Sequence, residues 1–357
     1  MKHTLTLFAL ALSLELFAQS PYISQVWEYM PAPGQFVNVL PEYEEGDNAD
    51  IMRQKAQEAI ADNNQGLITL GGWGGYVVFG FDHMVTNVSD KCDFVVYGNA
   101  FYSGSSDPTA KLAGSCEPGI IQVSYDANGN GEPDDAWYEL AGSAHDSTAT
   151  WHQYELTYFR PSSEHVATPS TTNKALIDTS YIHWKDNYSN NGYMYQISFH
   201  TQSYFPQWIE KDSLVFNGTR LPDNNADISG KGTNYILYAY DWGYADNHPN
   251  NSPNAELDID WAVNEDGTPA HLPGIHFVKV YTGVHQQCGW IGETSTEITG
   301  AEDINMVFDG INYANFEENE TEAYYTLLGS YIGTRRPNAQ GTYIVRKGQH
   351  TYKIILK

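Results

Sequence analysis

Two short apolar runs joined by a polar loop, between residues 120 and 140, place the strongest constraint on what this chain can fold into. The first run reads IIQVSY and the second reads WYEL. β-branched and aromatic residues in runs of this length favour strands, and the Asn-Gly pairs between them are strong turn signals. The stretch therefore predicts a β-hairpin whose loop spans residues 126–135.

Runs of the same kind recur along most of the 357 residues, separated by Gly, Asn, Asp and Pro. They cover residues 67–70, 76–81, 94–97, 154–159, 193–199, 214–216, 235–240 and 275–281. Residues 48–64 instead have apolar positions at helical spacing, with Asp47 or Asn48 available to cap the start. Many short strands and one short helix predict an all-β protein built as a β-sandwich.

The loop of the predicted hairpin carries six oxygen-bearing side chains: Asp126, Asn128, Asn130, Glu132, Asp134 and Asp135. Hard cations bind such oxygens, and the pattern up to Gly131 resembles the first half of the EF-hand calcium loop. The twelfth position of that loop is a bidentate Glu, whereas Trp137 stands there in this chain. The missing carboxylate would come from Asp134 or Asp135. We therefore predict Ca²⁺ as a cofactor, with a plain acidic hairpin turn as the alternative.

The two ends of the chain differ in composition from the middle. Residues 1–18 have a basic start, an apolar run and a candidate cleavage site, as in a secretory signal peptide. Residues 312–322 are polar and typical of a linker, and residues 323–357 are positively charged with strand and hairpin patterns. We predict a main β domain over residues 19–311, a linker and a small C-terminal β module. The protein is expected to be secreted or at the outer cell surface, with its signal peptide removed.

The formal net charge of −26, from 44 acidic and 18 basic residues, disfavours nucleic acid and anionic lipid as partners. The three cysteines, Cys92, Cys116 and Cys288, leave two interpretations open. One is a Cys92–Cys116 disulfide, and the other is three buried thiols. Their wide spacing, with no histidine cluster nearby, argues against a zinc site.

A long polar loop over residues 241–255 is the main candidate for ligand binding, because long loops in compact domains are often functional. Aromatic side chains stack on flat rings, and Asp or Asn side chains orient hydroxyls and amides. The loop leads into residues 256–261, whose alternation predicts a strand with two carboxylates on one face, and a later turn adds another aromatic wall. The candidate ligand-binding residues are Asp241, Trp242, Tyr244, Asp246, Asn247, Asp258, Asp260 and Trp290.

Several sequence blocks resemble a family of uncharacterised cell-surface proteins of Bacteroidota, among them GGWGGYVVFGFDH (71–83), FVVYGNAFY (94–102) and ELDIDWAV (256–263). Some members resemble products encoded beside outer-membrane vitamin B12 uptake systems. The pattern is more distantly similar to jelly-roll ligand-binding domains. The resemblance implies a jelly-roll-like sandwich, a cobamide as one ligand and an outer-membrane transporter as one partner. Residues 327–357 resemble the end of the sorting domain used by type IX secretion.

These features lead us to expect a secreted or cell-surface calcium-binding β-sandwich that binds a small molecule or a glycan without catalysis. A glycan-active hydrolase, which needs two carboxylates across a cleft, is one alternative. A purely structural surface protein is the other.

Overall fold

The computed structural model describes residues 19–104, 110–306, 322–326, 331–347 and 350–356. The chain divides into two compact units, unit 1 (Met1–Ile304) and unit 2 (Asn305–Lys357). The predicted signal peptide and all but the last residue of the predicted linker lie outside the described residues. Within the described ranges, no helix has the length and apolar character needed to cross a bilayer.

Unit 1 is built on a six-stranded antiparallel sheet with the order β1-β3-β17-β7-β8-β16. Its strands are β1 (Gln25–Met30), β3 (Tyr76–Thr86), β7 (Gly119–Ser124), β8 (Trp137–Leu140), β16 (Ala262–Val263) and β17 (Gly274–Thr282). The predicted hairpin is confirmed, because β7 and β8 pair antiparallel on either side of the polar loop. Late in the sequence but central in the sheet, β17 joins β3 to β7.

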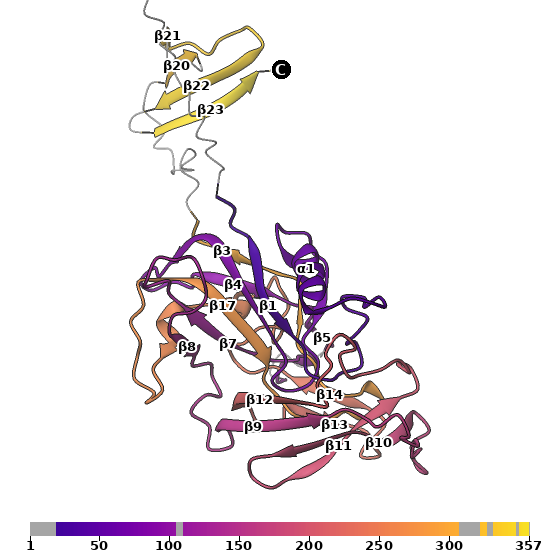
Figure 1. Ribbon diagram of the computed structural model, residues 1–357. Coiled ribbons are helices and arrows are strands. Elements are labelled where there is room, and N and C mark those ends of the chain that lie inside the picture. The colour runs from indigo at the N-terminus through magenta and orange to yellow at the C-terminus, as the bar shows by residue number, and fades with distance from the viewer. Residues whose placement is uncertain (1–18, 105–109, 307–321, 327–330, 348–349, 357) are drawn as a thin grey trace, which may run out of the picture. The chain divides into compact units, whose positions relative to one another are not determined.

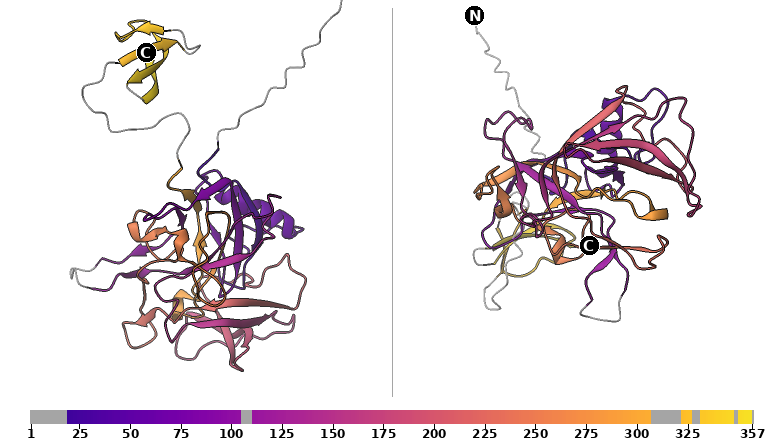
Figure 2. Two further views of the ribbon diagram at one scale, coloured as in Figure 1. Left: turned by 90° about the vertical axis from the view of Figure 1, so that its left-hand side faces the viewer. Right: turned by 90° about the horizontal axis from the view of Figure 1, so that it is seen from below.

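A four-stranded sheet with the order β11-β10-β9-β12 forms the second layer of unit 1. Its strands are β9 (Trp151–Phe159), β10 (Leu176–Asp186), β11 (Asn191–Ile197) and β12 (Ser213–Arg220). Figure 1 shows these strands below the six-stranded sheet, and the left view of Figure 2 shows the two layers from another side.

The two layers share one hydrophobic core. Tyr154, Leu156 and Tyr158 alternate along β9, and all three are buried in the same cluster as Phe79 of β3 and Val280 of β17. Side chains at alternate positions of a strand lie on one face, so this face of β9 packs against the larger sheet. The all-β prediction is confirmed.

Three smaller sheets complete unit 1, with the orders β13-β14-β6-β5, β15-β4-β19 and β18-β2. Their strands are β2 (Ile68–Thr69), β4 (Phe94–Tyr97), β5 (Phe101–Tyr102), β6 (Ala113–Ser115), β13 (Asn225–Asp227), β14 (Tyr235–Tyr238), β15 (Glu256–Leu257), β18 (Glu297–Ile298) and β19 (Gly300–Asp303). The 3-10 helices are η1 (Pro253–Ala255), η2 (Ile259–Trp261) and η3 (Gly289–Ile291). These short elements hold the loops in which polar and aromatic side chains gather.

The predicted helix is α1 (Ala49–Ile60). The side chain of Asn48 accepts a hydrogen bond from the backbone N–H of Ile51, which satisfies one of the unpaired donors at the helix start. Met52, Ala56 and Ile60, spaced four residues apart, are buried in the main core. The helix prediction is confirmed at both its N-cap and its buried face.

Unit 2 contains one antiparallel sheet with the order β21-β20-β22-β23. Its strands are β20 (Glu322–Thr326), β21 (Tyr331–Gly333), β22 (Gly341–Lys347) and β23 (His350–Leu356). The predicted terminal hairpin is formed by β22 and β23. Tyr324 and Val345 face each other across paired strands and are buried.

All three cysteines lie within the described residues and remain thiols, so the Cys92–Cys116 disulfide is not formed. Cys116 and Cys288 are buried in a small cluster with Leu237 and Ala239. Burial raises the pKa of both thiols to about 12, which keeps them protonated and unreactive at neutral pH.

Candidate functional site

A hollow of about 640 Å³ opens beside the sheet β13-β14-β6-β5, the end of β11 and the 3-10 helix η3. We call it the aromatic pocket. Its walls combine aromatic and aliphatic side chains from segments far apart in the sequence. They include Phe36, Phe101, Ile197, Phe199, Ile228, Tyr235, Leu237, Trp290 and Ile291.

Three lining aromatic side chains are exposed: Phe199 to 68%, Phe101 to 58% and Trp290 to 44%. Phe199 and Trp290 meet edge to face, with their ring centroids 6.0 Å apart. The indole N–H of Trp290 donates to the carbonyl oxygen of Thr233 at 3.1 Å, which holds the ring in place. A group of large apolar side chains left in water around a hollow is typical of a binding site.

A glycine sets the position of Trp290. Gly289 has φ +57°, a conformation that favours glycine, and an added Cβ would lie 2.7 Å from the carbonyl oxygen of Gly232. Any larger residue would push η3 away from the segment that accepts the indole hydrogen bond.

Two carboxyl groups, Glu117 and Glu297, line the same pocket. With Asp246 they form a cluster in which one oxygen of each residue lies within 4.8 Å of the others. Asp246 and Glu297 are buried, and Glu117 is half-buried. We call these three residues the carboxyl cluster.

The carboxyl cluster is held by hydrogen bonds from its surroundings. Asp246 accepts the backbone N–H groups of Asn99 and Ala100, both at 2.8 Å, and that of Glu297 at 3.0 Å. The hydroxyls of Thr69 and Ser295 donate to Glu297. These contacts tie three distant segments together and fix the carboxyl groups in place.

Burial raises the pKa of all three carboxyl groups, and the charge of Glu297 adds to the rise at Glu117 and Asp246. No lysine or arginine among the described residues lines the aromatic pocket. Because like charges so close together cannot all be ionised cheaply, the cluster favours a bound proton, a cation or a hydrogen-bond donor from a ligand.

The structure places two of the predicted ligand-binding residues at this site. Trp290 lines the aromatic pocket, and Asp246 belongs to the carboxyl cluster behind it. Two other residues of the same predicted set are buried and structural. Tyr244 packs in a hydrophobic cluster and accepts the backbone N–H of Ala144, and Asn247 bonds the backbone N–H and carbonyl of Tyr240.

The remaining predicted residues lie apart from the aromatic pocket. Trp242 is 37% exposed and packs against Trp261, with centroids 4.5 Å apart, and Asp241 precedes it on the surface. The predicted strand over residues 256–261 is wrong beyond Leu257, because Ile259–Trp261 forms η2. Asp258 caps η2 by accepting the N–H of Asp260, whose own carboxylate accepts from Asn87.

The predicted calcium loop is exposed and ordered by its own side chains. Asp126 accepts the backbone N–H groups of Gly129, Asn130 and Gly131 at 2.8, 3.1 and 2.9 Å. Asp134 accepts the amide groups of Asn128 and Asn130.

The carboxylate and amide oxygens of this loop are the kind of ligand atom that a hard cation such as Ca²⁺ binds. Asp135 closes the loop by accepting the backbone N–H groups of Ala127 and Asn128. Glu132, at the tip, is exposed and is a weaker candidate for a direct ligand.

Sequence reasoning missed most of the aromatic pocket. Glu117 follows Cys116 in an unremarkable strand lead-in, Glu297 lies in a two-residue strand, and Phe199 ends a strand pattern. No spacing in the sequence linked Glu117 to Glu297. No protein-family model matches the chain, and no curated protein matches it.

Proposed function

We propose that unit 1 binds a small organic ligand that combines a flat apolar face with hydrogen-bond donors, and does so without catalysis. The observation that carries this proposal is the group of exposed aromatic rings, Phe101, Phe199 and Trp290, beside the half-buried carboxyl group of Glu117 and the buried one of Glu297. A ring of the ligand stacks on the aromatic side chains, and its hydroxyl or amino groups donate to the carboxyl groups.

The size and polarity of the pocket favour a sugar unit over a whole cobamide. A hollow of about 640 Å³ is within the range that encloses drug-sized ligands. A sugar ring offers an apolar face and several donors, and an amino sugar adds a cation for the uncompensated carboxyl groups. Cobamide binding is supported only by the sequence resemblance, and cobamides are therefore included in the binding screen described below.

Hydrolysis of a glycan receives less support from these residues. Glycoside hydrolases hold their two carboxyl groups about 5 to 9.5 Å apart to accommodate the sugar and water. One carboxyl oxygen of each of Glu117, Asp246 and Glu297 lies within 4.8 Å of the others, and both oxygens of Asp246 accept backbone N–H groups. Binding without turnover is therefore the better match.

The proposal also includes export and calcium binding. The signal-like residues 1–18 and the basic tail support a secreted or surface location, and the donors from Asp126 to Asp135 support a calcium loop. An outer-membrane transporter remains a proposed partner on the strength of the family resemblance alone.

The test is a calorimetric screen of the full chain against neutral sugars, amino sugars, larger glycans and cobamides. For the best ligand, Trp290→Ala and Phe199→Ala are expected to weaken binding by about 1 kcal/mol or more each, roughly fivefold. The matched control is Trp242→Ala, which removes an exposed indole outside the aromatic pocket.

Two outcomes would contradict the proposal. Equal affinities in the wild type, Trp290→Ala and Phe199→Ala would move the site elsewhere on the protein. Turnover of a glycan that Glu117→Gln abolishes would replace binding with hydrolysis.

A further inference from the structure

A second hollow, of about 900 Å³, is lined by residues of β8, β9 and β12 and of the loop that follows β16. We call it the acidic cleft. Five carboxylates line it together with two histidines, and no lysine or arginine among the described residues does so. These residues are Glu139, His145, Asp146, His152, Glu155, Glu265 and Asp266. Such a cleft attracts cations by its summed negative potential.

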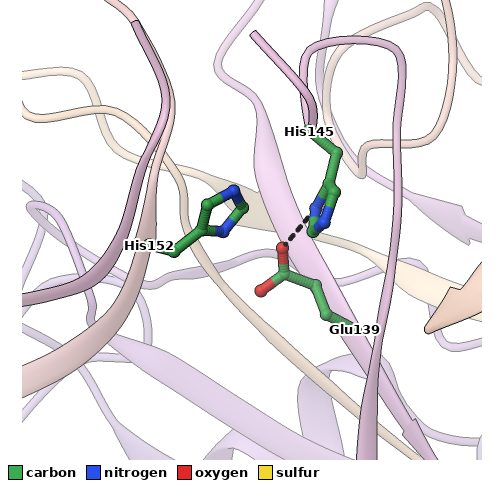
Figure 3. A group of neighbouring side chains, drawn as sticks. All are labelled: Glu139, His145 and His152. Atoms are coloured by element: carbon green, nitrogen blue, oxygen red, sulfur yellow. Dashed lines mark hydrogen bonds and ion pairs between the residues drawn. The ribbon is translucent and has the colours of Figure 1, made fainter. Parts of the chain in front are cut away.

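Glu139, His145 and His152 come together at one place in the acidic cleft, as Figure 3 shows. One ligand atom from each lies within 4.8 Å of the others. His145 Nδ1 is 3.1 Å from Glu139 Oε1, and the two imidazole centroids are 4.7 Å apart. In a tetrahedral site, ligand atoms about 2.0–2.2 Å from the metal lie roughly 3.3–3.6 Å from each other. Small side-chain rotations would bring the ligand atoms of Glu139, His145 and His152 to these distances.

The carboxylate of Glu139 is oriented by a layer of buried hydroxyls. Its Oε2 accepts the hydroxyl of Thr219 at 2.8 Å and that of Tyr281 at 3.1 Å. Tyr281 in turn accepts the backbone N–H of Thr219 at 2.9 Å, and both residues are buried. Oε1 therefore remains directed at His145. Outer hydrogen bonds that fix a ligand in this way are typical of metal sites.

The backbone is also adapted to this arrangement. The register of β9 and β12 shifts between Gly218 and Arg220, where two residues of β9, His152 and Gln153, face one residue of β12. Gln153 adopts φ +54°, which is rare for a non-glycine residue. A β-bulge of this kind turns side chains out of the regular alternation and is frequent next to functional sites.

Space for the buried hydroxyl layer depends on Gly218. An added Cβ there would lie 2.9 Å from the hydroxyl oxygen of Tyr281. A side chain at position 218 would thus displace the group that orients Glu139.

We propose that Glu139, His145 and His152 bind a divalent transition-metal ion, with zinc as the best match, and leave an open coordination position facing the acidic cleft. Two imidazoles and one carboxylate are ligands that zinc and similar ions accept. Three protein ligands with a free position are the arrangement found in zinc sites that activate water or bind a substrate group. This site is separate from the aromatic pocket, since the two hollows share no lining residue.

The test uses the untagged full chain, stripped with a chelator and titrated with zinc chloride by calorimetry. One zinc ion per chain is expected. His152→Asn and Glu139→Gln should each lower the affinity at least tenfold, and Tyr281→Phe should lower it by a smaller factor. Because His152 is exposed, His152→Asn is expected to fold normally, and its circular dichroism and melting temperature would verify this.

Two controls separate this site from other cation sites. His165→Asn removes a histidine that pairs with Asp178 elsewhere on unit 1, and it should leave zinc affinity unchanged. Asp126→Asn in the predicted calcium loop should do the same. Cobalt(II) in place of zinc gives a visible absorption spectrum that reports a four-coordinate site, and His152→Asn should remove it.

The proposal is overturned if the wild type binds no zinc. It is also overturned if His152→Asn and Glu139→Gln bind zinc as the wild type does. Neither result would affect the ligand proposal, because Trp290 and Phe199 lie in the other hollow.

Discussion

At the scale of single residues, Glu293 has a buried carboxyl group that is only half satisfied. Its Oε1 accepts the backbone N–H of Gln35 at 2.5 Å, while its Oε2 is buried without a hydrogen-bond partner among the described residues. Burial raises the pKa of Glu293 to about 8. The folded protein therefore keeps this group protonated at pH values where an unfolded chain would release the proton.

We expect Glu293→Gln to reduce the pH dependence of stability. Between about pH 4.5 and pH 8, the folded state binds more protons here than the unfolded state, so the free energy of unfolding falls as the pH rises. Glutamine does not titrate, so the free energy of unfolding of the variant, relative to that of the wild type, should rise by about 4 kcal/mol between these two pH values.

Urea unfolding followed by tryptophan fluorescence measures this effect in unit 1, which contains all nine tryptophans. Glu58→Gln, at an exposed position of α1, is the matched control and should leave the pH profile of the wild type unchanged. Parallel profiles for Glu293→Gln and the wild type would show that Glu293 is ionised in the folded protein.

At the scale of structural elements, the β7–β8 hairpin is the part of unit 1 that joins two different features. Its loop contains the predicted calcium donors, and its second strand carries Glu139 into the acidic cleft. Trp137 and Glu139 are two residues apart on β8, so they share the face that lines this cleft. A change in the order of the predicted calcium loop would therefore alter the position of the adjoining end of β8.

Calcium is expected to raise the melting temperature of the protein by a few degrees at saturating concentration. A ligand present at 100 times its Kd stabilises the folded state by about 2.7 kcal/mol. Asp134→Asn should remove most of this rise, because it deletes a carboxylate that calcium requires while keeping a side chain of the same shape.

The measurement is differential scanning calorimetry with calcium and after chelation. Asp212→Asn, at an exposed position outside both hollows, is the control and should respond to calcium as the wild type does. If the wild type melts at the same temperature with calcium and after chelation, the loop is an acidic turn and not a calcium site.

At the scale of the whole molecule, unit 1 closes its own sheets before unit 2 begins. The last strand of unit 1, β19, pairs with β4 through four residue pairs from Gly300 to Asp303. Unit 2 begins at Asn305 and has its own sheet, in which Tyr324 and Val345 are buried. Stability of unit 1 should therefore not require unit 2.

Deletion of residues 305–357 is expected to leave the melting temperature of unit 1 within about 2 °C of the full chain, a change below 1 kcal/mol. Deletion from residue 300 is the contrasting variant, because it also removes β19 and exposes the backbone of β4. It should unfold at a clearly lower temperature. If the shorter deletion also destabilises unit 1, then unit 2 is part of the main fold.

In the native host, the shorter deletion should also mislocalise the protein if the basic tail is a sorting signal.

The sequence by itself determined the local elements of this protein. The apolar runs predicted β3, β4, β7, β8, β9, β14 and β17, and the helical stripe predicted α1 with its Asn48 cap. The apolar periodicity of strands and helices depends only on neighbouring residues, so it can be recognised without knowing the fold. The pattern at residues 256–261 failed because Asp258 hydrogen-bonds its own backbone two residues on, which favours a cap and a turn over a strand.

Only the tertiary structure decided which chemical groups meet. Glu117 and Glu297 are 180 residues apart in number, and they meet because β17 places the C-terminal part of unit 1 beside β7. Glu139, His145 and His152 all lie within residues 139–152, on β8, in the loop that follows and at the bulge of β9. The hydroxyls that orient Glu139 come from β12 and β17, so the sequence alone did not mark these residues as a metal site. Sheet pairing between distant segments depends on the packing of the whole core, and no local period in the sequence records it.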